Sequence, residues 1–146
     1  MKTNHGIAEA TLQGYCSTYF RSKGFLTREE VPFLFKIADI FCFHEETGEC
    51  VAVEVKVSKW RQALKQAIVY QMMADKVYIA LLYDHVRAVD QDLLVQSGVG
   101  LLGVHTAGGV EEIIPAPISP RRMGRFVSAA VATAFPDIES SACLLI

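Results

Sequence analysis

The stretch KIADIFCFHEETGECVAVEVKV, residues 36–57, decides which fold this chain is expected to adopt. It contains two apolar segments, residues 36–43 and 50–57, on either side of the polar run at 44–49. Gly48 supplies the left-handed backbone conformation that a short hairpin loop often needs. We therefore predict two antiparallel strands joined by a short turn.

The position of the turn predicts which residues of the two strands face each other. If the turn is centred between residues 46 and 47, Asp39 lies opposite Glu54 and Ile37 lies opposite Lys56. Side chains alternate between the two faces of a strand, so Glu54 and Lys56 share one face. The other face is expected to be core, because it carries Val51, Val53, Val55 and Val57. A register slip of one residue would break this pairing.

Two carboxylates and an ammonium on neighbouring strands suit a divalent cation bound beside a phosphate. Mg²⁺ prefers oxygen ligands and keeps several waters, so Asp39, Glu54 and the backbone carbonyl of Val55 are candidate ligands. A metal bound there would activate a water and polarise a phosphoryl oxygen. Lys56 would orient the attacking water or stabilise the developing charge. The alternative is a solvated salt bridge, but charges set among apolar residues are costly to bury unpaired.

The rest of the chain predicts strands and helices in alternation. Helices are expected at residues 6–22, 59–75, 85–96 and 123–134, and further strands at 28–34, 76–83, 99–104 and 110–114. Pro32 marks its strand as an edge strand. On the helix at 59–75, Gln62, Gln66 and Tyr70 recur at every fourth position and form one stripe. This order predicts an α/β fold with a mixed sheet covered by helices on both faces.

Asp39, the triplet Glu54-Val55-Lys56 and the pair Gln66-x-x-x-Tyr70 together resemble the PD-(D/E)XK nuclease superfamily. Members of that family have a restriction-endonuclease-like αβββαβ core, with an acid on the second core strand and (D/E)-x-K on the third. A subgroup that includes RecB-type and lambda-exonuclease-type nucleases carries Gln-x-x-x-Tyr on the following helix. The resemblance covers residues 5–105, with a C-terminal extension at 106–146. Ala38 stands where the family's nominal motif has proline.

The resemblance implies a Mg²⁺-dependent nuclease, with Mn²⁺ as a substitute and DNA as the favoured nucleic acid. The catalytic residues would then be Asp39, Glu54, Lys56, Gln66 and Tyr70. The metal ligands would be Asp39, Glu54, Val55 and, on the first helix, Glu9. A homodimer would let two such sites act on both strands of a duplex.

Composition leaves a second function open. The net charge of −2 does not favour nucleic-acid binding, which draws heavily on lysine and arginine. Basic residues nevertheless gather after the hairpin, and Lys59, Arg61 and Lys65 are the candidate nucleic-acid contacts, although a solvated surface would also explain them. The acidic balance keeps open a non-catalytic module that uses the nuclease fold as a binding or assembly scaffold.

Length and hydropathy predict one cytoplasmic domain. The 146 residues match the size of a single domain. The apolar runs are too short to span a bilayer, and the N-terminus has no apolar signal-peptide core. The four cysteines form no Cys-x-x-Cys pair, which argues against a zinc ribbon.

Overall fold

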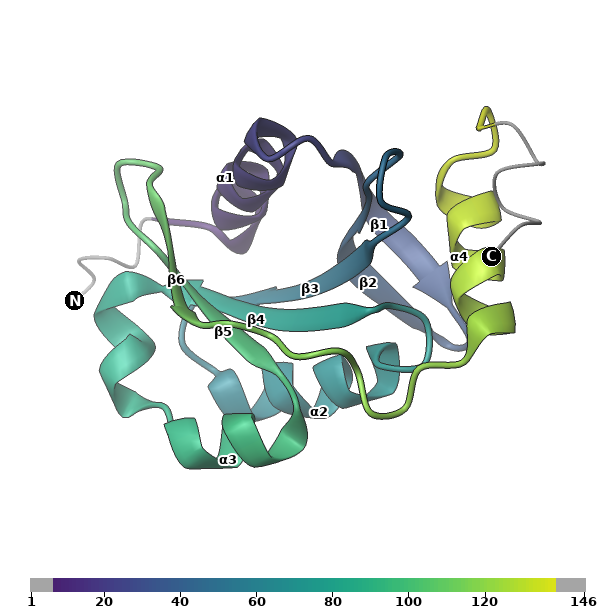
Figure 1. Cartoon of the computed structure of the whole chain (residues 1–146). Coiled ribbons are helices and arrows are strands. Elements are labelled where there is room, and N and C mark those ends of the chain that lie inside the picture. Colours follow the sequence, from purple (N-terminus) through teal and green to yellow (C-terminus); the bar gives the residue numbers. More distant parts are fainter. Residues whose placement is uncertain (1–6, 139–146) are drawn as a thin grey trace.

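A computed structural model describes residues 7–138 of the chain. Its centre is a six-stranded sheet in which spatial order follows chain order (Figure 1). The strands are β1 (Leu26–Phe33), β2 (Lys36–Phe43), β3 (Cys50–Lys56), β4 (Lys76–Leu82), β5 (Gly100–Val104) and β6 (Val110–Ile114). The helices are α1 (Glu9–Ser22), α2 (Trp60–Tyr70), α3 (Gln91–Ser97), α4 (Gly124–Ala134) and the 3₁₀ helix η2 (Tyr83–Ala88).

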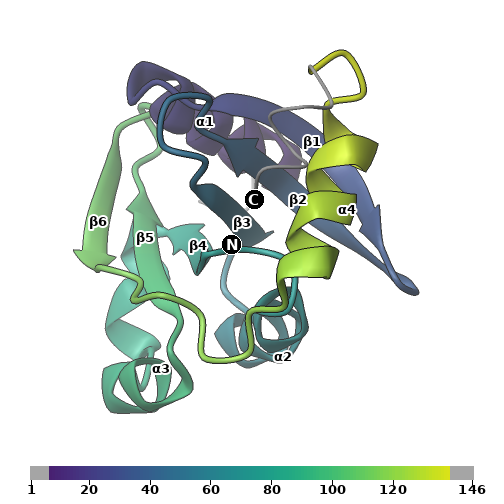
Figure 2. The ribbon, with the colours of Figure 1, turned by 45° about the vertical axis from the view of Figure 1, so that its right-hand side comes forward.

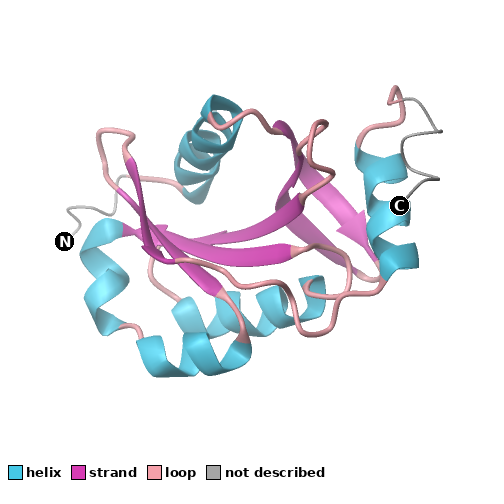
Figure 3. Cartoon of the chain, viewed as in Figure 1, coloured by secondary structure: helices cyan, strands magenta, loops and turns pink. Residues whose placement is uncertain are grey.

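The sheet is mixed, as predicted. β3, β4 and β5 run parallel, while the pairs β1–β2, β2–β3 and β5–β6 are antiparallel. Helix α1 covers one face, helices α2 and α3 cover the other, and α4 lies beside β1 (Figures 1 and 3). The α/β class and the αβββαβ order are therefore confirmed. No helix within residues 7–138 combines the length and the apolar character needed to cross a membrane.

Each face of the sheet has its own apolar layer. On the α1 face, Leu12, Cys16 and Phe20 pack with Val51, Val53 and Val55 of β3. The layer under α2, α3 and α4 is larger and includes Phe41, Trp60, Ala63, Leu94, Val127 and Phe135. The expected valine face of β3 is thus confirmed as core, which leaves Glu54 and Lys56 on the side of α2.

The predicted register of the β2–β3 hairpin is confirmed where the two strands are paired. Phe43 faces Cys50 and Ile40 faces Val53. The backbone ladder ends at Ile40, so the next pair in register, Asp39 and Glu54, lies where the strands separate. This separation falls at the position where the sequence predicts the acids.

Two predicted helices need correction. The expected helix at 59–75 ends at Tyr70 and continues as turns. The expected helix at 85–96 is wrong, because η2 ends at Ala88 and extended backbone at Val89 separates it from α3. Asp90 explains the break, since its side chain caps α3 by accepting a hydrogen bond from the Leu93 amide. The other predicted elements are confirmed with shifts only at their ends.

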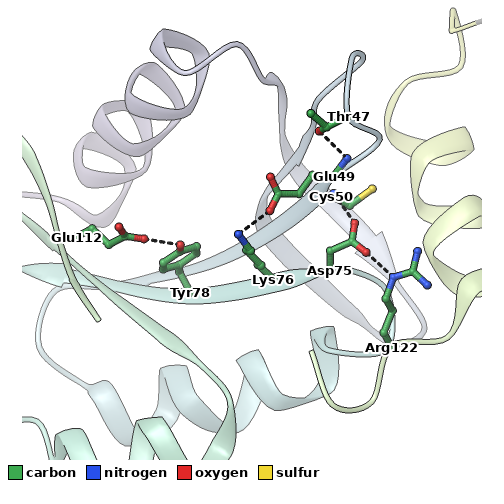
Figure 4. Close-up of polar contacts among 8 residues, drawn as sticks. All are labelled: Thr47, Glu49, Cys50, Asp75, Lys76, Tyr78, Glu112 and Arg122. Carbon is green, nitrogen blue, oxygen red and sulfur yellow. Dashed lines mark hydrogen bonds and ion pairs between the residues drawn. The ribbon is translucent and has the colours of Figure 1, made fainter. Parts of the chain in front are cut away.

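Polar contacts fasten the segment after β6 to the start of β3 and β4 (Figure 4). The carboxylate of Asp75 accepts hydrogen bonds from the backbone amide of Cys50, at 2.7 Å, and from the guanidinium of Arg122. Lys76 forms an ion pair with Glu49 at 2.9 Å. These contacts lie at the N-terminal end of β3, away from Glu54, and hold the chain that leads into α4.

Candidate functional site

Asp39 is held against the strand that carries the acid-x-lysine triplet. Its Oδ2 accepts a hydrogen bond of 2.7 Å from the backbone amide of Val55. The backbone hydrogen bonds between β2 and β3 stop at Ile40, the residue next to Asp39. The Asp39 side chain therefore takes the place of a backbone acceptor for the Val55 amide. This contact brings Asp39 to the Glu54-Val55-Lys56 backbone, as the hairpin register predicts.

The backbones of β1 and β2 are both irregular at one pair of facing residues, Glu30 and Asp39. This irregularity explains why the Asp39 side chain can turn toward Val55. Glu30 has φ +59°, a left-handed conformation that is uncommon for residues other than glycine. It occupies the position opposite Asp39, between the pairs Glu29–Ile40 and Val31–Ala38. Ile40 packs in the α1 layer, whereas Val31 and Ala38 pack in the opposite layer. Both strands therefore change face at this point, and backbone strain of this kind costs about 1–3 kcal/mol.

Gln13 of α1 bridges the two irregular strands. Its side-chain amide donates to the Glu30 carboxylate at 2.9 Å, to the Asp39 backbone carbonyl at 3.1 Å and to the Glu29 carboxylate at 3.2 Å. Gln13 is only 8% exposed. Sequence reasoning missed both Gln13 and Glu30. The available signal was an amide next to Leu12, on the side of the helix that packs on the sheet.

Glu54 is the most unusual acid of the site. It is only 3% exposed, and its Oε1 atom is buried with no hydrogen-bond partner among residues 7–138. Burial raises the pKa of Glu54 to about 8, and the nearby charge of Asp39 adds to the rise. The Tyr70 hydroxyl and the Lys56 ammonium act in the opposite direction. At neutral pH the carboxyl thus stays largely protonated until positive charge arrives beside it.

The pKa of Asp39 is likewise raised by some neighbouring groups and lowered by others. Burial raises its pKa, and the charges of Glu30 and Glu9 add to this effect. The Val55 amide and the Lys56 ammonium lower it. Asp39 and Glu54 therefore share one electrostatic environment in which Lys56 is the cation that favours both charged forms.

Tyr70 and Gln66 lie on the same side of α2, as the helical spacing predicts. Tyr70 is fully buried, and its hydroxyl donates a hydrogen bond of 2.7 Å to the backbone carbonyl of Ile37. Gln66 Oε1 lies 3.5 Å from that hydroxyl. Burial and the charge of Glu54 raise the pKa of Tyr70. Tyr70 thus joins α2 to the start of β2 and faces the candidate acids.

The remaining predicted residues lie nearer the surface. Glu9 is exposed at the first residue of α1, although its charge still raises the pKa of Asp39 and Glu54. Lys59, Arg61 and Lys65 are exposed at the start and along the outer side of α2. Within the described residues, no group of three or more histidine, cysteine, aspartate or glutamate side chains is arranged to hold a metal ion.

No protein-family model matches the sequence, and no curated protein matches it. The structure is similar to the SPO1766 protein of unknown function from Silicibacter pomeroyi, with a TM-score of 0.69 and 20% identity. That match covers 96% of this chain and 90% of the other, so the shared fold includes the segment after residue 105.

Two further solved structures are similar over part of the chain. A repair endonuclease from Pyrococcus abyssi has a TM-score of 0.49 at 17% identity, covering 68% of this chain and 47% of that one. SfsA from Pyrococcus furiosus, solved in complex with Ca²⁺, has a TM-score of 0.42 at 13% identity, covering 74% and 64%. At these values the similarity concerns the arrangement of helices and strands and carries no inference about activity.

Proposed function

We propose that this protein is a metal-dependent nuclease that hydrolyses phosphodiester bonds, with Mg²⁺ as its ion and DNA as the favoured substrate. The observation that carries this proposal is the buried Glu54 oxygen without a hydrogen-bond partner among the described residues, beside the half-buried acid Asp39. An unpaired charge in such a place is costly. A cation ligated by Glu54 and Asp39 would remove that cost and favour the charged form of both carboxyls.

The donor set fits a hard divalent ion. Asp39 and Glu54 offer carboxylate oxygens, and Val55 offers a backbone carbonyl from the same strand. Because Mg²⁺ retains several waters, it needs few protein ligands, so two carboxylates can hold it although the described residues contain no group of three potential ligands arranged around an ion. Mn²⁺ would use the same oxygens, and Glu9 would act through an intervening water. When bound, the ion would lower the pKa of a water and polarise a phosphoryl oxygen.

The chain's own residues would divide the remaining work. Lys56, whose charge already reaches both acids, would hold the attacking water or stabilise the charge that develops on the phosphate. Tyr70 and Gln66 would fix the orientation of the Glu54 carboxyl from α2. Lys59, Arg61 and Lys65 would contact the phosphate backbone, where each cation adds affinity that salt weakens.

A non-catalytic role for the same fold is the second candidate. It is favoured by the net charge of −2. In that case the protein would bind nucleic acid or a partner without cleaving it. Calorimetric titration with Mg²⁺ and Mn²⁺ separates the two candidates, because a scaffold has no reason to bind either ion tightly.

The test is a cleavage screen over single-stranded, duplex, nicked and branched substrates with Mg²⁺ or Mn²⁺. We expect Asp39→Asn, Glu54→Gln and Lys56→Ala each to abolish cleavage while the far-ultraviolet circular dichroism stays native. Glu45→Gln, which changes an exposed acid in the β2–β3 turn, is the matched control. Metal-dependent cleavage at the original rate in Asp39→Asn would overturn the proposal.

A further inference from the structure

The turn between β1 and β2 exposes a group of apolar side chains next to the candidate site. Phe35 is 86% exposed, Leu34 is 60% exposed and Ile37 is 53% exposed. Figure 2 shows this turn projecting at the end of the β1–β2 hairpin, past α4. The strand that follows carries Asp39, roughly 13 Å along the chain at about 3.3 Å per residue. The exposed group therefore lies about four residues before Asp39 along the chain.

The base of this turn is held in place, so the apolar side chains are presented outward. Phe33 is buried and packs edge-to-face on Phe126 of α4, with ring centroids 5.7 Å apart. The Tyr70 hydroxyl fixes the Ile37 carbonyl from α2. Leu34 has φ +55°, a left-handed conformation that closes the turn tightly. A turn whose two ends are held in this way loses less conformational freedom on binding a ligand than an untethered one.

A cation accompanies the exposed ring. The ammonium of Lys36 lies 5.7 Å from the centroid of the Phe35 ring. Proteins that bind single-stranded nucleic acid combine aromatic rings with basic side chains. The bases stack on the rings, and the phosphates pair with the cations. This charge complementarity favours a nucleic-acid strand over an uncharged apolar partner.

The small size of the group disfavours a second copy of the chain as its occupant. A stable protein interface takes about 20–30 residues from each partner. Leu34, Phe35 and Ile37 alone supply far less than that. A flat base, comparable in size to one aromatic ring, matches the exposed area better.

We propose that the β1–β2 turn stacks on an unpaired base of the substrate strand through Phe35, while Lys36 pairs with an adjacent phosphate. This inference rests on the proposed nuclease function and narrows its substrate to nucleic acid with unpaired bases beside the cleaved bond. A fully paired duplex buries its base faces and offers no such surface to Phe35.

Fluorescence anisotropy with a labelled single strand, and with the same sequence as a blunt duplex, tests the turn in EDTA, where no cleavage occurs. We expect Phe35→Ala to weaken single-strand binding by about 5- to 100-fold, since stacking is lost. Phe35→Trp should retain it. Lys36→Ala should reduce the salt dependence by roughly one phosphate contact. Ile118→Ala, which alters a residue 62% exposed elsewhere on the surface, should bind as the unaltered protein does.

Two results would overturn the inference. One is single-strand binding by Phe35→Ala that equals the unaltered protein. The other is a dimer that Phe35→Ala converts to a monomer in sedimentation velocity while single-strand binding is unchanged, which would make the turn a homodimer contact. The nuclease proposal fails separately, because Asp39→Asn tests cleavage and leaves the turn intact.

Discussion

The two ends of β3 use similar residues in opposite ways. At the N-terminal end, Asp75 accepts hydrogen bonds from the Cys50 amide and Arg122, and Lys76 pairs with Glu49. At the C-terminal end, Glu54 is buried with an oxygen that has no partner in the described residues. The first arrangement satisfies its charges and stabilises the fold. The second leaves the Glu54 Oε1 atom without a partner in the described residues, which makes it a candidate functional site.

The depth of burial separates the two ends as well. The side chains of Lys76 and Glu49 are 34% and 29% exposed, so their ion pair is screened by solvent. Glu54 is only 3% exposed, so a charge on its carboxyl would have no such screening. Substitutions at each end in turn test this difference between the two ends of β3.

The largest effect is expected at the candidate site. Glu54→Gln should lower the single-turnover cleavage rate with Mg²⁺ by on the order of 10³-fold, because several kcal/mol of transition-state stabilisation would be lost. Its fold should remain, since glutamine keeps the size of the side chain. A cleavage rate close to that of the Glu45→Gln control would place the chemistry elsewhere and remove the contrast between the two ends of β3.

The second effect is a pH dependence of stability. Because the folded protein raises the pKa of Glu54 from 4.5 to about 8, it holds a proton that the unfolded chain releases in that range. The free energy of unfolding should therefore fall as pH rises from about 4.5 to about 8, relative to Glu54→Gln. Urea unfolding across this range measures it. Mg²⁺ should reduce the fall, and identical pH profiles for the two proteins would contradict the raised pKa.

A third, intermediate effect is expected at the opposite end of the strand. Asp75→Ala should lower the free energy of unfolding by about 1–3 kcal/mol, because the Cys50 amide and Arg122 lose their acceptor. Cleavage per folded molecule should not change. Denaturant unfolding and a cleavage assay on the same sample check both statements. A loss of cleavage in a stably folded Asp75→Ala protein would show that the two ends are coupled.

The smallest effect belongs to the partly exposed ion pair. Lys76→Ala should cost less than about 1 kcal/mol, because solvent screens pairs of this exposure. The same unfolding measurement, repeated at high salt, should show the difference shrinking further. A larger loss would mean that Lys76 contributes more than its pair with Glu49.

Local patterns predicted most of the fold. The strand at 36–43, the turn with Gly48 and the valine face of β3 follow from alternation and from turn chemistry, and the structure confirms them. The helix predicted at 85–96 failed because Val89 is extended and Asp90 begins a separate helix as the N-cap of α3. A run of residues compatible with a helix does not show whether the chain forms one helix there or two short ones.

The candidate site was predictable only in part. The sequence placed Asp39 near Glu54, and the Val55–Asp39 hydrogen bond agrees with that placement. Gln13 and Glu30 escaped notice because their roles depend on contacts between α1, β1 and β2. The position of Gln13 next to Leu12 indicates which side of α1 it lies on, but not which groups of β1 and β2 it contacts.

The sequence by itself determined the alternation of strands and helices, the register of the β2–β3 hairpin and the face on which Glu54 and Lys56 lie. These features depend on neighbours within a few residues, where backbone geometry dictates the outcome. Only the tertiary structure decided the change of face at Glu30 and Asp39, the bridge from Gln13 and the burial of Glu54. Those depend on segments distant in sequence, whose packing determines which polar atoms find a partner and which are left without one.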